Sequence, residues 1–164
     1  MEMRPLRLDD VDLLVALDDD PEVKRFIDGG KPAVRADVEA TAFAALGHRW
    51  LAFDRDDGTF VGWFGARPTG PGERELGFRM RRAAWGRGLA TEGARLMVDT
   101  SFAELGAQRV WAQTMAVNSR SRAVLERCGL HYVRTFHVDW PDPLPGAEHG
   151  EVEYELRRGD WHGG

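Results

Sequence analysis

The sequence is poor in cysteine and has no long apolar run. Its 164 residues include one cysteine, Cys128, so an internal disulfide framework is excluded and the chain fits a reducing compartment. No segment approaches the roughly 20 apolar residues that are needed to cross a bilayer. The residues after Met1 also lack the apolar core of a signal peptide. We therefore expect a cytoplasmic protein with no membrane partner.

Metal-ligand spacing and an excess of basic residues are missing as well. The five histidines, at positions 48, 131, 137, 149 and 162, show none of the short spacings of metal sites, and we expect no metal. The net charge of −5 argues against nucleic acid as the main partner. Four arginines nevertheless gather at positions 79, 81, 82 and 87. A local basic patch on an acidic protein suits a small polyanionic ligand.

The composition is that of one folded domain. Apolar residues make up 43% and charged residues 30% of the chain, which is ordinary for a globular protein and too apolar for disorder. The length lies within the roughly 100–200 residues of a typical domain. We expect residues 1–164 to form a single domain, with 158–164 as a frayed tail.

Capping residues and apolar spacing predict a mixture of helices and strands. Three early helices are expected to begin near Asp9, Asp20 and Val34. A longer helix should run from about Gly88 to residues 102–106. Its predicted buried residues are Leu89, Ala90, Ala94, Leu96, Met97 and Val98. The predicted strands cover residues 5–8, 49–53, 60–66, 74–80, 108–114, 130–137 and 150–156, and a short helix covers 119–128.

Aromatic residues in these elements have two interpretations. Phe26 and Phe43, on the early helices, are candidates to line a substrate groove, although those helices can equally pack on the sheet alone. Trp63 and Trp111 lie in predicted strands and are expected in the core. Trp140 lies in a proline-rich loop and is a candidate for a substrate site.

A basic, glycine-punctuated stretch connects the strand at 74–80 to the long helix. It reads Arg81-Arg82-Ala83-Ala84-Trp85-Gly86-Arg87-Gly88-Leu89-Ala90-Thr91-Glu92. Two glycines let the backbone turn tightly, and the helix start offers free N–H groups with a partial positive charge. Together these features outline an anion-binding site. Surface loops that bind nothing can share the pattern, and the spacing is not that of a nucleotide P-loop.

A second segment supports the glycine stretch. In Asn118-Ser119-Arg120-Ser121, Asn118 either caps the following helix or binds a ligand. The segment Glu126-Arg127-Cys128-Gly129-Leu130 ends that helix. A family resemblance of the chain rests on these two segments, the glycine stretch, Leu6-Arg7-Leu8 and Glu75-Leu76-Gly77-Phe78. The chain resembles a GNAT-type N-acetyltransferase, of the ribosomal-protein N-terminal acetyltransferase (RimJ/RimL-like) branch, over nearly its whole length.

The resemblance implies an α+β (α/β) GNAT acyl-CoA N-acyltransferase fold. This is a mixed, mostly antiparallel twisted sheet of about seven strands flanked by helices, whose strands before and after the glycine stretch splay apart to hold acetyl-CoA. The amides of residues 86–91 would take the pyrophosphate, and the strand at 78–80 would pair with the pantetheine. The implied cofactor-binding residues are Phe78, Arg79, Met80, Arg81, Trp85, Gly86, Arg87, Gly88, Leu89, Ala90, Thr91, Asn118 and Ser121.

The resemblance also implies direct attack by an amine, so that no enzyme nucleophile is needed and Cys128 is structural. A lysine amine, with a pKa of about 10.4, depends on a base more than an α-amino group with a pKa of about 8. Glu75 is the first candidate base, with an arginine-paired strand residue as the alternative; Asp139 and Glu148 are second choices. Many family members have a tyrosine where this chain has Leu125, so Ser121 is the candidate donor to the leaving thiolate.

The acceptor is left open between a protein N-terminus and a small-molecule amine. The tentative acceptor-binding residues are Phe26, Asp139, Trp140 and Glu148. A non-catalytic acyl-CoA-binding or sensor domain on the same fold is the main alternative, and a nucleotide-binding module is a weaker one. A homodimer is allowed but not indicated.

Overall fold

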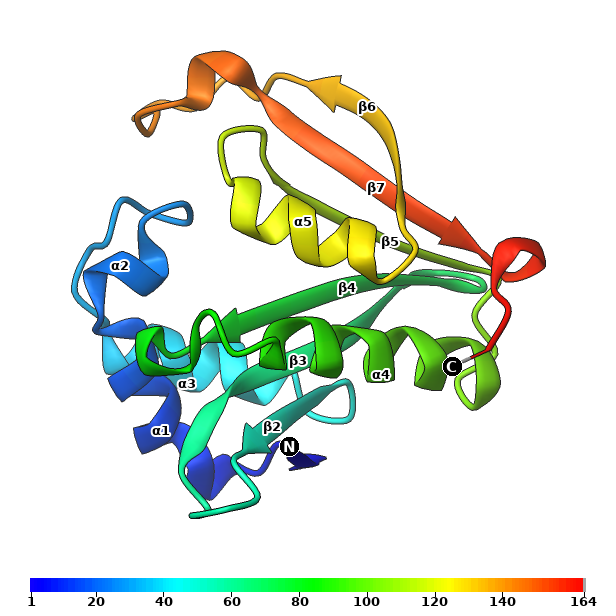
Figure 1. Cartoon of the computed structure of the whole chain (residues 1–164). Coiled ribbons are helices and arrows are strands. Elements are labelled where there is room, and N and C mark those ends of the chain that lie inside the picture. Colours follow the sequence, from blue (N-terminus) through cyan, green and yellow to red (C-terminus); the bar gives the residue numbers. More distant parts are fainter. Residues whose placement is uncertain (164) are drawn as a thin grey trace.

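Seven strands form one sheet in the computed structural model, which describes residues 1–163 (Figure 1). The strand order is β1-β2-β3-β4-β5-β7-β6, and β4 and β5 are the one parallel pair. The predicted mixed, mostly antiparallel sheet is therefore confirmed. The strands are β1 (Glu2–Pro5), β2 (Arg49–Phe53), β3 (Phe60–Gly70), β4 (Glu73–Met80), β5 (Arg109–Met115), β6 (His131–Phe136) and β7 (Glu151–Arg157).

Helices cover both faces of the sheet. Successive strand residues point to opposite faces, and in β2 Leu51 packs into a cluster with α1 and α3, whereas Ala52 packs into a cluster with α4 and α5. No helix within residues 1–163 is long and apolar enough to span a membrane. The helices are α1 (Val11–Asp18), α2 (Pro21–Lys24), α3 (Arg35–Ala44), α4 (Leu89–Ala103) and α5 (Ser119–Arg127), with short 3-10 turns η1 (Leu8–Asp10), η2 (Arg82–Ala84), η3 (Ala147–His149) and η4 (Arg158–Asp160).

The parallel strands β4 and β5 touch along only part of their length. They pair at Glu73–Glu75 with Arg109–Trp111, and beyond that point no strand pairing joins them. In Figure 1 the two strands meet at one end and diverge toward the other, with α5 beside the gap. Residues 76–80 of β4 and 112–115 of β5 therefore face each other with backbone edges that no neighbouring strand occupies.

Helix α4 lies close against the sheet because Gly93 has no side chain. A Cβ at this position would lie 2.3–2.6 Å from three ring atoms of Phe64 on β3. The buried residues of α4 follow helical spacing from Gly93 to Phe102, but Leu96 is 50% exposed. The prediction that Leu96 is buried is wrong. Each residue advances about 100° around a helix, so Leu96 lies on the side opposite both Ala94 and Val98, which are buried.

The first strand lies earlier than predicted. Residues 5–8 were expected to be extended, whereas β1 ends at Pro5 and a 3-10 turn begins at Leu8. The buried carboxylate of Asp10 causes this turn, since it accepts a hydrogen bond from the Arg7 backbone N–H at 2.8 Å. It also forms an ion pair with Arg4 at 2.5 Å.

Residues 158–161 pack against the body instead of fraying as expected. The Trp161 ring stacks on Phe102 with centroids 5.4 Å apart, and its Nε1 donates to Asp99 Oδ1 at 2.8 Å. Arg158 donates to the carbonyl of Ala107 at 3.4 Å. The Trp161 ring, through its partners on α4, and the Arg158 guanidinium, through the segment that follows α4, hold residues 158–161 in place. Position 164, the last of the expected tail, lies outside the described residues.

Candidate functional site

A cavity of about 1600 Å³ occupies the space between the diverging strands β4 and β5. Its walls come from both strands, from the glycine stretch and the start of α4, from the start of α5, and from α2 and the β6–β7 loop. This volume exceeds the roughly 300–1,000 Å³ of most small-molecule pockets. The cavity has room for an extended ligand together with a second, smaller one.

Strand β4 contributes a free backbone edge to this cavity. Leu76, Phe78 and Met80 line it from one face of the sheet, and Gly77 and Arg79 line it from the other. An extended ligand that carries amide groups can add to such an edge as an extra strand would. The predicted residues 78–80 therefore lie where an amide-containing arm could pair with them.

The glycine stretch curls around one end of the cavity. Gly86 and Gly88 have φ values of +75° and +79°, a left-handed conformation that glycine adopts at little cost. Nothing lies within 4 Å of a Cβ built at either position, so the backbone conformation and not crowding favours glycine. Gly88 is the N-cap of α4, and Thr91 in the first turn of that helix lines the cavity. The first turn of α4 thus presents its free N–H groups close to the cavity.

Trp85 and Arg120 contact each other at this end of the cavity. Trp85 is fixed by a hydrogen bond from its Nε1 to the Met80 carbonyl at 3.0 Å. The Arg120 guanidinium on α5 lies 5.0 Å from the centre of the Trp85 ring, and both residues line the cavity. Nothing in the sequence pattern singled out Arg120, since it is one of several arginines on a short helix.

Three predicted cofactor-binding residues do not line the cavity. Arg87 donates to Asp54 Oδ2 at 2.6 Å, and Arg81 donates to the Phe60 carbonyl at 3.3 Å. Leu89 packs against the hydrophobic core. These side chains point away because each finds a partner on β3, on its hairpin, or in the core. The remaining ten predicted residues line the cavity, and these are Phe78, Arg79, Met80, Trp85, Gly86, Gly88, Ala90, Thr91, Asn118 and Ser121.

Asn118 caps α5 and also lines the cavity. Its Oδ1 accepts from the Ser121 backbone N–H at 3.3 Å, and its Nδ2 donates to Thr114 Oγ1 at 3.2 Å. An amide NH₂ carries two donors, so one remains for a ligand. Ser121, one turn into the helix, lines the cavity beside it.

Glu75 lines the cavity but is engaged by Arg67. Arg67 Nε donates to Glu75 Oε2 at 3.1 Å, and the Arg67 Nη2 contacts the same oxygen. This is the arginine-paired arrangement that was the alternative for this residue. Arg67 occupies one of the two carboxylate oxygens, and the role of Glu75 as a base stays a prediction.

Glu151 is another of the carboxylates that line the cavity, and the sequence interpretation missed it. It begins β7, opposite Met115 of β5 and Phe136 of β6. Within residues 1–163 it makes no ion pair, and burial raises its pKa above the ordinary glutamate value. The alternation of Glu151, Glu153 and Glu155 placed three glutamates on one face, but only the structure shows that the other two pair with Arg109.

Two of the four tentative acceptor-binding residues line the cavity, and two do not. Phe26 of the α2 region and Trp140 of the β6–β7 loop line the cavity. Asp139 and Glu148 are not among its lining residues, and Glu148 accepts a hydrogen bond from the Gly146 backbone N–H at 3.0 Å. Trp63, expected in the core, is partly exposed and lines the cavity.

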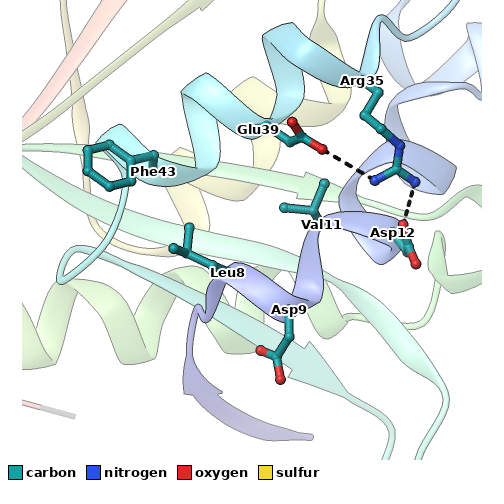
Figure 2. Close-up of a pocket in the computed structure, with 7 residues that line it drawn as sticks. All are labelled: Leu8, Asp9, Val11, Asp12, Arg35, Glu39 and Phe43. Atoms are coloured by element: carbon teal, nitrogen blue, oxygen red, sulfur yellow. Dashed lines mark hydrogen bonds and ion pairs between the residues drawn. The ribbon is translucent and has the colours of Figure 1, made fainter.

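Phe43 is 68% exposed and belongs to a different hollow. This hollow, of about 500 Å³, lies between η1, α1 and α3 (Figure 2). The cation of its lining, Arg35, contacts Asp12 and lies 3.5 Å from Glu39, so these two carboxylates already have a partner. Phe43 therefore does not line the substrate groove for which it was a candidate.

Cys128 is buried, and burial raises the pKa of its thiol to about 11. A thiol with so high a pKa is a poor nucleophile, which fits a structural residue. Within the described part of the chain, no three His, Cys, Asp or Glu side chains are grouped in a way that could hold a metal ion.

Comparison with known proteins identifies relatives of this architecture. Residues 1–131 match the acetyltransferase (GNAT) domain family. The chain is 36% identical over 179 residues to FsC-acetyl coenzyme A-N(2)-transacetylase of Aspergillus fumigatus, an alignment that covers 98% of this chain and 75% of that protein.

Solved structures share the fold at low sequence identity. Spermidine N-acetyltransferase from Vibrio cholerae, in complex with CoA and spermine, superposes with a TM-score of 0.83 at 13% identity, covering 97% of this chain and 96% of the other. RimL, a ribosomal L7/L12 alpha-N-protein acetyltransferase in complex with CoA, superposes with a TM-score of 0.78 at 15% identity, covering 94% and 92%. At these identities the likeness concerns the fold alone.

Proposed function

The chain belongs to the acetyltransferase (GNAT) domain family and is an acetyl-CoA-dependent acyltransferase, and on that premise we propose that it acetylates the primary amine of a small molecule by direct attack in a ternary complex. The observation that carries this proposal is the divergence of β4 and β5, which leaves a free strand edge beside the glycine stretch. The family match over residues 1–131 confirms the predicted membership of the GNAT family.

The small-molecule acceptor is favoured over a protein N-terminus by the comparisons. The relative that aligns over 98% of this chain is named FsC-acetyl coenzyme A-N(2)-transacetylase, whereas the ribosomal-protein acetyltransferase RimL shares only 15% identity. The RimJ/RimL-like branch and an acceptor peptide therefore become the second candidate. Both acceptors present an amine, so the same chemistry serves either.

We propose that acetyl-CoA binds along the β4 edge with its pyrophosphate at the glycine stretch. The amides of residues 86–91 and the start of α4 supply donors and a partial positive charge for the diphosphate. The free edge at 76–80 would pair with the amide groups of the pantetheine arm. The second Nδ2 hydrogen of Asn118 would donate to the same arm.

In the proposed reaction the amine nitrogen forms a bond to the acetyl carbon and the carbon–sulfur bond breaks. A backbone N–H of β4 near residues 78–80 would stabilise the oxygen on which negative charge develops. Glu151, or Glu75 once released from Arg67, would take the proton that the amine loses. The Ser121 hydroxyl would donate a hydrogen bond to the departing CoA thiolate.

Release of CoA from acetyl-CoA, measured across a panel of amines, tests this function. The panel contains polyamines, amino acids, lysine peptides and peptides with free N-termini. We expect turnover with at least one small-molecule amine and weaker turnover with peptides. Tight binding of acetyl-CoA in calorimetry without turnover of any amine would support the sensor alternative, and tighter binding of ATP than of acetyl-CoA would overturn the proposal.

Three further expectations stay proposals. We propose that the chain acts as a single domain, that it works in the cytoplasm, and that no metal takes part in transfer. Limited proteolysis tests the first, and activity in the presence of a chelator tests the third. Light scattering would show whether a homodimer forms.

A further inference from the structure

A cluster of cationic side chains lies on the sheet face that α1 and α3 cover. Register pairs Trp63 with Arg79, and Gly65 with both Arg49 and Gly77. The Trp63 ring lies across Gly77 and Gly65, since Cβ atoms built at these glycines would come 3.4 and 3.8 Å from it. The indole therefore forms a flat floor for the part of the cavity on this face.

Two guanidinium groups share this indole. The Arg49 Cζ lies 4.1 Å from the Trp63 ring centroid, and the Arg79 Cζ lies 5.5 Å from it. Cation–π attraction favours each contact, but the two like charges repel each other. Trp63 and Arg79 line the cavity. Arg49 is not among the lining residues, but its guanidinium reaches the Trp63 ring from β2, where Arg49 pairs with Gly65.

The cluster consists of Arg49, Arg79 and Asp18, and it therefore has one more positive charge than negative charge. Arg79 Nη1 donates to Asp18 Oδ1 at 2.6 Å, and this is the ion pair of the cluster. Within residues 1–163 Arg49 has no ion pair and no side-chain hydrogen bond. The Arg79 Nε is buried and has no acceptor.

The charge on Arg49 is costly to the free protein. Burial, together with the nearby charge of Arg79, lowers the pKa of Arg49 to about 10, although Asp18 acts in the opposite direction. Arg49 still carries its charge at neutral pH. A partly buried cation with neither a carboxylate partner nor a hydrogen-bond acceptor is destabilising unless something else compensates it.

We propose that Arg49 and Arg79, above Trp63, form a subsite for an oxyanion of the acceptor, so that the acceptor is an amine that also bears a carboxylate or phosphate group. The inference rests on the proposed function and names the acceptor class for the same cavity. Guanidinium groups match the planar, two-oxygen geometry of such anions. A bound oxyanion would supply the missing negative charge.

The phosphates of CoA are not the anions expected here. Side chains alternate along β4, so Arg79 points to the face opposite Phe78 and Met80. Phe78 and Met80 pack with α4, whose N-terminus is the proposed pyrophosphate site, whereas Arg79 reaches Asp18 on α1. The cluster thus lies on the side of the sheet that is left for the acceptor.

Acceptor pairs that differ only in the anion test the subsite. β-Alanine is compared with β-alaninamide, and phosphoethanolamine with ethanolamine, with rates expressed per neutral amine so that differences in amine pKa cancel. We expect kcat/KM of the wild type to favour the anionic member of at least one pair by about tenfold or more. The pair with the larger ratio distinguishes carboxylate from phosphate.

Arg49→Met is the matched variant, because it keeps a long apolar side chain on Trp63 and removes the charge. We expect it to lower kcat/KM for the anionic acceptor by about tenfold and for the neutral acceptor by less than twofold, with an unchanged KM for acetyl-CoA. Arg49→Lys should be intermediate. The thermal midpoint of Arg49→Met should equal or exceed that of the wild type, since a partly buried charge that Arg79 repels is removed.

Equal losses with both acceptors, or a lower thermal midpoint with no change in preference, would make Arg49 a structural residue and overturn the subsite. Turnover of amines with no preference for the anionic member would overturn it as well, while leaving the acetyltransferase function standing. Absence of turnover with every amine would instead overturn the proposed function, so the two failures are distinguishable.

Discussion

Arg87 of the glycine stretch donates a hydrogen bond to Oδ2 of Asp54 at 2.6 Å, across 33 residues of sequence. Asp54 begins the β2–β3 turn, and its Oδ1 also accepts from the Asp56 backbone N–H at 3.1 Å. The hydrogen bond from Arg87 lowers the pKa of Asp54 and raises the pKa of Arg87. Arg87 therefore ties the glycine stretch to a neighbouring hairpin and does not itself reach the cavity.

Asp54→Asn should loosen the glycine stretch and weaken acetyl-CoA binding. We expect KM for acetyl-CoA to rise about twofold to fivefold with little change in kcat, since exposed ion pairs are weak. The pKa of Asp54 is depressed in the folded state, so the pair is intact at neutral pH and is lost only as pH falls through that lowered value. Initial-rate kinetics test this, with Asp56→Asn as control; equal effects of the two variants would contradict it.

Gly93→Ala should destabilise the fold although alanine favours helices. The added methyl would lie within 2.6 Å of the Phe64 ring, and overpacking of this kind costs about 1–3 kcal/mol, more than the gain in helix propensity of about 1 kcal/mol. Denaturant unfolding measures the change. Phe64→Leu in the Gly93→Ala background should recover part of the loss. A Gly93→Ala protein more stable than the wild type would show that Phe64 moves aside freely.

Local sequence patterns predicted the parts of the fold that local chemistry decides. The two glycines of the stretch make the tight turn that was expected, through left-handed φ values, and Asn118 caps its helix. The order of strands and helices followed from alternation and caps. The predicted first strand failed because its position depends on Asp10, whose partner Arg4 lies outside the turn itself.

The missed features depend on contacts between distant residues. Glu151 could not be distinguished from Glu153, because the partner of Glu153, Arg109, lies 44 residues away in sequence. The sequence pattern placed Trp161 in a frayed tail, whereas in the structure it contacts Asp99 and Phe102 of α4. The pairing of Glu153 with Arg109 and the packing of Trp161 against α4 depend on tertiary structure, and the periodicity of a single sequence does not predict them.

Glu151→Gln should separate catalysis from stability. Burial raises the pKa of Glu151 in the folded state, so this carboxylate lowers stability as pH rises from the ordinary glutamate pKa to the raised value. At neutral pH the glutamine variant should therefore melt at a higher temperature than the wild type. If Glu151 is the base, kcat should fall by about 10²–10⁴-fold.

Glu75→Gln is the matched comparison for that experiment. Removal of this carboxylate leaves Arg67 without its partner, so stability should fall slightly and not rise. In the wild type, kcat should increase with pH through the raised pKa of Glu151, and this limb should vanish in Glu151→Gln but persist in Glu75→Gln. Loss of the limb in Glu75→Gln alone would assign the base to Glu75.

Asn118 offers a test of whether a capping residue also holds the cofactor. Asn118→Ala removes the cap and should cost about 1 kcal/mol of stability. Asn118→Ser restores a capping oxygen but has no NH₂ group, so it should unfold close to the wild type. We expect KM for acetyl-CoA to rise about fivefold or more in both variants, because the lost NH₂ donor is common to them. A KM raised only in Asn118→Ala would mean that Asn118 acts through the helix, since the serine would then have restored everything that the cofactor requires.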